Sequence, residues 1–337
     1  MVLVVVGLAE GVADRFFAMS VVGGHVRLLL VIPLFFIGES WVDPRMAAFV
    51  AGIMRDGLVP AGARPALDAE VLRTRRWASS SWPEVVALAL AIVLQVGGLR
   101  LQTYGETGGA DSARTSIAFF VYLNAGLIMF RFLLFRWVWK LLLWSRFLWR
   151  VSRLDLHLMP GHPDRDGGLG LLEAVHERFT PLVAALSVLE CASLAESISV
   201  GTLAATAVYP TLAFLLVLDA VLFIGPLLAF TDKLWSARTQ GVEVYKALAA
   251  RYVTEFEAKW TGNRMPPEPL MGNADFQSMA DLANAVSVVK GMRWITAGPR
   301  LLTMMTLAAV APLTPLVLFE YPIAELTQKF FARLVGL

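Results

Sequence analysis

Three of the four histidines in this chain fall within 20 residues, beside two aspartates. The candidate ligands in this stretch are His157, His162, Asp164, Asp166 and His176. Imidazole and carboxylate groups together suit a divalent transition metal, so a metal site is one interpretation of the stretch, although its spacing matches no established zinc pattern and the structural interpretation that follows is favoured over it. The alternative is a structural turn, in which Asp166 caps the next helix and glycines allow close backbone packing. These glycines are Gly167, Gly168 and Gly170.

Polar side chains within apolar segments form a second set of candidates. They are Asp219, Arg131, Asn124, Glu190, Glu196 and Arg136. An ionisable group at the centre of a bilayer costs about 2.5–3.5 kcal/mol on insertion scales, so such groups face a bundle interior or an aqueous path. The pattern therefore predicts either an ion pathway or buried structural pairs. Asp219 has no charged neighbour in sequence, and we expect its polar partner to come from another span, with Arg131 or Asn124 as first candidates.

The elements that must position these residues are long apolar helices. Of the 337 residues, 57% are hydrophobic and 17% are charged, and the mean hydropathy is +0.63. Soluble domains carry about 25% charged residues, and a helix needs about 20 apolar residues to cross a bilayer core. We predict an all-α polytopic membrane helix bundle of six full spans, with a partial one at residues 1–18. The six spans are Val26–Val42, Val85–Leu99, Thr115–Leu143, Phe179–Val200, Val208–Thr231 and Pro299–Phe319.

Basic residues in the linkers predict the orientation of the bundle. The linkers rich in Arg and Lys are 43–83, 144–178 and 232–298. The positive-inside rule places these three in the cytoplasm and the charge-poor linkers 100–114 and 201–207 outside. We therefore expect a multi-pass protein of the cytoplasmic (inner) membrane, with the lipid bilayer as its first partner.

The same pattern divides the chain into three parts. Residues 1–231 are predicted to form the transmembrane bundle with its cytoplasmic loops. Residues 232–298 are predicted to form a cytoplasmic helical hairpin, because two amphipathic helical patterns flank the proline-rich loop at 265–269. Residues 299–337 hold the last span and an amphipathic interfacial helix at 323–337.

Two polar segments resemble sequence elements of a family of uncharacterised bacterial polytopic inner-membrane proteins. Segment 162–172, with His-Pro-Asp and then Gly-Gly-Leu-Gly, is similar to the family element HPDxxGGLGFL. Segment 275–284 is similar to DxQSxADLxNS, and the matching residues are Asp275, Gln277, Ser278, Asp281 and Asn284. The resemblance implies the bundle architecture and an apolar helix upstream of residue 1, but no particular activity. Because both segments carry it, we expect them to pack together beneath the bundle.

Composition limits the possible functions. A net charge of only +2 gives no basic field for nucleic acid, and the single Cys191 excludes an intramolecular disulfide and a cysteine-based zinc cluster. We expect no cofactor other than a divalent metal. The leading interpretation is a channel or transporter for an ion or small solute, acting as a homo-oligomer. The alternatives are a metal-dependent membrane enzyme that uses His157, His162 and Asp164, and a non-catalytic scaffold or sensor. No HExxH motif or nucleophile elbow supports the enzyme.

Overall fold

The structure is a computed structural model of the chain. It describes residues 22–105, 117–199, 208–262 and 268–316. Within these residues every regular element is a helix and no strand occurs, which confirms the predicted all-α class. The expected partial span at 1–18 and the amphipathic helix at 323–337 lie outside the described residues.

The described part begins with one long helix. Its parts are α3 (Val22–Val26), the π-helical turn η2 (Arg27–Val31) and α4 (Ile32–Arg55). The helix continues beyond Val42, the predicted end of the first span, and passes through Pro44. A proline removes one helical hydrogen bond, but the turns that follow keep apolar contacts such as those of the buried Phe49. Packing thus extends a helix that the sequence pattern predicted to stop.

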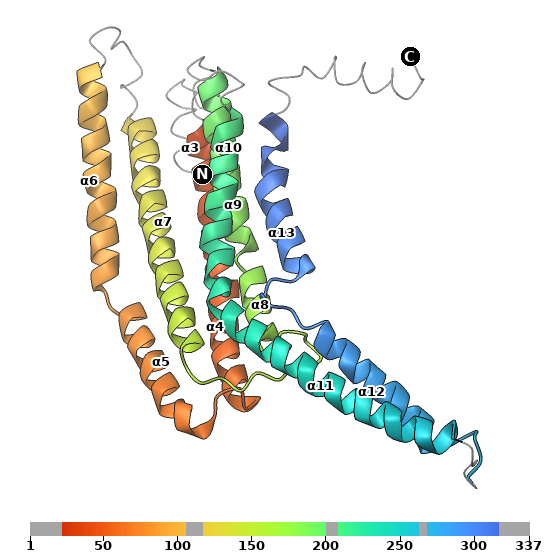
Figure 1. The fold of residues 1–337 in the computed structure, drawn as a ribbon. Helices are drawn as coiled ribbons and strands as arrows, with labels where there is room; N and C mark the ends of the chain where they lie inside the picture. Colours follow the sequence, from red (N-terminus) through yellow and green to blue (C-terminus); the bar gives the residue numbers. More distant parts are fainter. Residues whose placement is uncertain (1–21, 106–116, 200–207, 263–267, 317–337) are drawn as a thin grey trace, which may run out of the picture.

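The predicted loop 43–83 is largely helical. The chain turns through η3 (Ala61–Ala63) into α5 (Arg64–Ala78), and α6 (Trp82–Gly105) then packs along α7 (Ile117–Ser152). Figure 1 shows α5 below α6 at the edge of the upright bundle. The large exposed apolar side chains of α6 include Val85, Val86, Ile92, Val93 and Val96. Exposed apolar surface of this extent suits contact with lipid.

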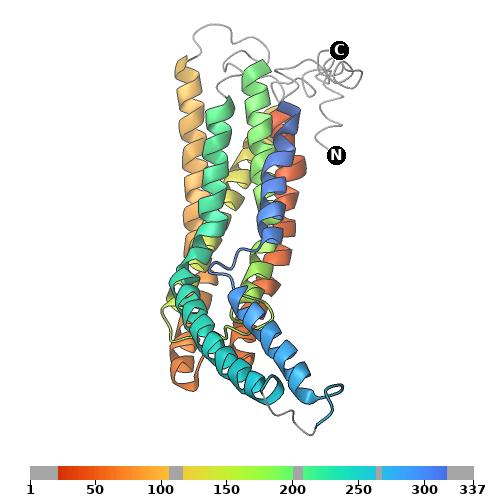
Figure 2. The ribbon, with the colours of Figure 1, turned by 45° about the vertical axis from the view of Figure 1, so that its right-hand side comes forward.

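The next two stretches of helix are α8 with α9, and α10 with η5, η6 and α11. Their bounds are α8 Gly170–Glu177, α9 Thr180–Ser199, α10 Val208–Asp219, η5 Ala220–Ile224, η6 Gly225–Phe230 and α11 Thr231–Trp260. After α10 the chain forms a π-helical turn (η5) and then a 3-10 turn (η6) before α11 begins. Figures 1 and 2 show α11 leaving the direction of the upright helices after this change of helix type. Such irregular turns are an established cause of helix bending.

The chain returns to the bundle through α12 (Ala274–Lys290), which packs side by side with α11. These two antiparallel helices lean away from the bundle in both views (Figures 1 and 2). α13 (Pro299–Val310) then packs against α9 and continues into the 3-10 turn η7 (Ala311–Leu316).

Aromatic side chains join the helices in the core. The rings of Phe35 on α4 and Phe130 on α7 stack at 6.1 Å between centroids. Lower in the bundle, Phe179 lies 6.3 Å from Trp137 of α7 and 5.7 Å from Phe223 of η5. One continuous core therefore includes α4, α7, the start of α9 and the irregular turn η5.

Four helices in the described part are long and apolar enough to cross a membrane. They are Gly24–Arg55, Ala61–Gly97, Gly170–Ile198 and Tyr209–Trp260. The predicted spans Thr115–Leu143 and Pro299–Phe319 are not among them. The described part of α7 carries Arg131, Arg136 and Lys140, and α13 has only 12 residues.

Candidate functional site

Asp164 organises the loop between α7 and α8. Its carboxylate accepts backbone N–H groups from Asp166 at 2.8 Å, Gly168 at 3.1 Å and Gly170 at 2.9 Å. His162 Nδ1 lies 2.8 Å from the same carboxylate. Burial opposes ionisation, but these hydrogen bonds outweigh it and hold the pKa of Asp164 below its usual value. The cap predicted at Asp166 is wrong: the N-cap residue of α8 is Leu169, and Asp164 accepts the N–H of Gly170, the first residue of the helix.

The loop needs its glycines, as the sequence predicted. Gly167 and Gly168 adopt φ angles of +66° and +100°, which disfavour residues with a Cβ atom. A Cβ on Gly168 would also lie 2.9 Å from the side chain of Leu58, which follows α4. These glycines therefore let the loop backbone pack directly against the end of the first helix.

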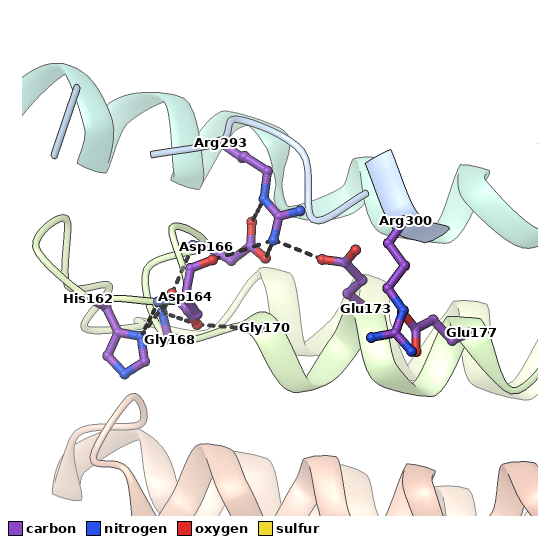
Figure 3. A network of polar contacts seen from close by, with 9 residues as sticks. All are labelled: His162, Asp164, Asp166, Gly168, Gly170, Glu173, Glu177, Arg293 and Arg300. Carbon is purple, nitrogen blue, oxygen red and sulfur yellow. Dashed lines mark hydrogen bonds and ion pairs between the residues drawn. The ribbon is translucent and has the colours of Figure 1, made fainter. Parts of the chain in front are cut away.

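Arg293 joins this loop to α8 and to the segment after α12 (Figure 3). Its guanidinium donates to both carboxylate oxygens of Asp166, at 2.8 Å from Nε to Oδ1, and lies 2.8 Å from Glu173. Arg300 and Glu177 pair at 3.2 Å one helical turn further along. Burial raises the pKa of Asp166 to about 6, although the charge of Arg293 acts in the opposite direction. The network fixes the return of the chain from α12 to α13.

His176 is buried and both of its ring nitrogens have partners. The indole Nε1–H of Trp144 donates to Nε2 at 3.3 Å, and Nδ1 lies 2.6 Å from the carbonyl oxygen of Phe223. An indole N–H can only donate, so Nε2 accepts and Nδ1 carries the proton that is donated to Phe223. His176 therefore joins α8 to Trp144 of α7 and to Phe223 of η5 by hydrogen bonds.

The predicted metal ligands do not come together. His176 is engaged as described, His157 is exposed, and His162 contacts Asp164. The described residues contain no group of three or more His, Cys, Asp or Glu side chains that could hold a metal ion. In the loop, Asp164 instead accepts backbone amides and Asp166 pairs with Arg293.

The expected packing of segments 162–172 and 275–284 is not what the contacts show. The loop meets the other end of α12, where the backbone N–H of Arg293 donates to the Arg165 oxygen at 2.7 Å. Asp275 instead binds α11, because Lys259 Nζ and Trp260 Nε1 donate to its carboxylate at 2.8 and 3.0 Å. These bonds lower the pKa of Asp275. The other residues of the second motif, Gln277, Ser278, Asp281 and Asn284, are exposed.

An open cavity of about 520 Å³ lies between α4, α5, the first turn of α6 and α7. Small-molecule sites have volumes of roughly 300–1,000 Å³. α4 and α7 run in the same direction (Figure 1). The wall of the cavity changes from charged to apolar along these two helices. The charged side chains of the lining are Glu39, Asp43, Arg75, Glu84, Arg136 and Lys140, and those of α4 and α7 lie at one end. Apolar side chains line the other end, among them Met46, Val50, Met54, Val71, Leu143 and Phe147.

At the charged end of the cavity, ion pairs join α7 to α4 and to α6. Arg136 pairs with Glu39 at 2.6 Å and approaches Glu84 at 3.5 Å. Lys140 pairs with Glu39 at 3.1 Å and with Asp43 at 2.8 Å. Arg136, a candidate for an ion pathway, therefore belongs to the wall of this cavity.

Two hydrogen-bonding groups in the cavity wall have no partner among the described residues. The indole N–H of Trp139 on α7 and the hydroxyl of Thr74 on α5 are buried and unsatisfied. A buried donor without an acceptor costs about 1–3 kcal/mol, so native structures rarely leave one unpaired. Both atoms are closed to solvent, so an acceptor on a bound molecule would satisfy them after a small movement of neighbouring side chains.

The other polar candidates from the apolar segments lie on α7 and α9. Arg131 donates to Gln95 of α6 at 2.8 Å, and Gln95 donates to Asn124. Arg27 of η2 lies within electrostatic reach of Glu196 on α9 and of Arg131. Asn124, Arg131 and Glu196 therefore contribute to polar contacts between neighbouring helices.

Asp219 lies in the interior, as predicted, with only 6% of its surface exposed. The expected partner is wrong, because Arg131 and Asn124 bind Gln95 instead. Neither carboxylate oxygen of Asp219 has a hydrogen-bond partner among the described residues. Glu190, the remaining candidate, is half-buried on α9.

Comparisons of the chain with protein-family models, with curated proteins and with solved structures find no match. Thr74, Trp139 and Arg293 were not among the residues predicted to form a site. One signal was present for the cavity, because Glu39 and Asp43 are four residues apart, as are Arg136 and Lys140. Residues with this spacing share a helix face, so two faces of opposite charge could have been matched.

Proposed function

We propose that this chain is an integral membrane transport protein that binds a small zwitterionic solute with an apolar body. The observation that supports it is the cavity, with both signs of charge and two unpaired polar groups at one end and apolar side chains at the other. Four helices of membrane-crossing length and the exposed apolar side chains of α6 support a place in a bilayer.

The finer topology is part of the proposal: six spans in the inner membrane, with the α11–α12 hairpin in the cytoplasm. Its support is the basic end of α7, which carries Arg146 and Arg150, is followed by Arg153, and lies toward the hairpin end of the molecule (Figure 1). Single cysteines at Ser236 and Gly108 should label from opposite sides of the membrane. The expected homo-oligomer stays a prediction, tested by the mass of the purified protein in detergent.

The wall suggests how such a solute binds. Its ammonium group would contact the carboxylates of Asp43 and Glu84, which are about half exposed and each lie near one cation. Its carboxylate would accept hydrogen bonds from Trp139 and Thr74, whose polar groups have no other partner. Its apolar body would contact the side chains around Val50. Recognition thus requires both charges on one small molecule.

Phenylalanine is a suitable probe, because it carries both charges and an apolar ring. The full chain in liposomes should take up radiolabelled phenylalanine saturably, and excess phenethylamine or phenylpropionate, which each lack one charge, should compete poorly. Trp139→Phe removes one donor and keeps an aromatic ring. We expect it to weaken binding about fivefold, as the loss of a hydrogen bond worth about 1 kcal/mol implies.

The matched control is Trp149→Phe, the same change on the same helix. Trp149 is exposed, contacts Arg150 and Arg153, and does not line the cavity. It should leave phenylalanine binding unchanged. Absence of saturable uptake in the unaltered protein, or equal binding by both tryptophan variants and the unaltered protein, would refute the proposed site.

A further inference from the structure

Asp219 is the buried acid that the cavity does not use. It ends α10, is 6% exposed, and accepts no hydrogen bond from any described residue. Every other strongly buried acid in the described part has a partner: Asp166 pairs with Arg293, and Glu70 pairs with Arg73 and Arg146. An ionised carboxylate left in this state would have lost its hydration without compensation. A bound cation would neutralise the carboxylate of Asp219.

The surroundings of Asp219 select which cation can bind. α9 and η5 pack against α10, and α8 touches η5 through Phe223. The titratable side chains that α8 and α9 carry are Glu173, His176, Glu177, Glu190, Cys191 and Glu196. None of them exerts a resolved charge effect on Asp219 or bonds to it. Among the described residues, no three His, Cys, Asp or Glu side chains come together to hold a metal ion. A single carboxylate in an apolar interior can hold a proton.

A hydrogen-bonded chain connects the neighbourhood of Asp219 to the cavity. The π-helical turn η5 starts at the residue after Asp219, and its Phe223 carbonyl accepts from His176. His176 accepts in turn from Trp144, which lines the cavity. π-helical turns occur frequently at functional sites. A rearrangement of η5 would therefore change both the burial of Asp219 and the position of Trp144.

We infer that Asp219 is a proton-binding site in the bundle interior, and that its proton is coupled to the cavity through Phe223, His176 and Trp144. The carboxylate takes up one proton when buried and releases it when η5 rearranges and water reaches the site. The coupling, but not the proton binding, rests on the proposed transport function. Proton-driven uptake of the solute follows from both parts.

Infrared difference spectroscopy of the full chain in nanodiscs tests the proton site directly. The spectrum of the unaltered protein minus that of Asp219→Asn should show the carbonyl stretch of a protonated carboxylic acid at about pH 5, where an exposed aspartate is still ionised. The control difference with Asp155→Asn, an exposed loop acid, should lack this band. If Asp219→Asn does not assemble, Asp219→Glu should keep the band at a shifted frequency. Absence of the band from the unaltered protein overturns the inference.

Uptake in liposomes tests the coupling. An inwardly directed proton gradient should raise phenylalanine uptake by the unaltered protein severalfold, while Asp219→Asn should still bind phenylalanine but lose this response. Equal responses of the two proteins would overturn the coupling. If phenylalanine is not taken up at all, the proposed function fails, and the infrared band still decides whether Asp219 binds a proton.

Discussion

The substitution Asp164→Asn tests the loop that joins α7 to α8. The asparagine keeps one acceptor oxygen, but its amide nitrogen replaces an oxygen that accepts N–H groups at 2.9 Å from Gly170 and 3.1 Å from Gly168. One charge-assisted hydrogen bond is worth about 1.5–3 kcal/mol, and a negative charge at the start of a helix adds about 0.3–1 kcal/mol. We therefore expect a loss of about 2–4 kcal/mol in the free energy of unfolding.

The assay is the temperature at which half of the purified protein leaves the monodisperse peak in gel filtration. Asp164→Asn should lower this temperature by several degrees. The matched control is Asp155→Asn, which removes an exposed acid from the same loop and should have little effect. Equal unfolding temperatures for the two variants would show that the carboxylate of Asp164 does not hold the loop.

Two further predictions concern the same region. Burial raises the pKa of Asp166 from 3.8 to about 6 against the pull of Arg293, so its contribution to stability is complete below pH 3.8 and is lost as the pH rises through 6. Between about pH 5 and about pH 7, the free energy of unfolding of the unaltered protein should fall by about 1 kcal/mol relative to that of Asp166→Asn. If the two proteins show parallel pH profiles of stability, the prediction is wrong. Gly168→Ala places a Cβ 2.9 Å from Leu58 at φ +100°, whereas Gly57 has φ +73° and open space. Gly168→Ala should therefore cost about 1–3 kcal/mol more than Gly57→Ala in unfolding measurements, and equal costs would refute close packing.

The helical character of the chain was predictable because it depends on local patterns. Apolar runs of sufficient length and amphipathic periodicity indicate helices whatever they pack against, so α6 and the two helices of the hairpin could be placed from the sequence. The glycines at 167 and 168 were also interpretable, because positive φ angles are a local property. Helix ends were less predictable. α4 continues beyond Val42 because packing around Phe49 outweighs the hydrogen bond lost at Pro44.

The partners of charged side chains were decided by the tertiary structure. Sequence indicated that Asp219 lies inside, because an unpaired charge is costly in lipid, but it matched Asp219 with Arg131, which Gln95 binds instead. The cavity combines α4, α5, α6 and α7, and its ion pairs join residues about 100 positions apart, as Glu39 and Arg136 do. Electrostatic pairing depends on distance in space, and side chains this far apart in sequence have no fixed distance until the helices pack.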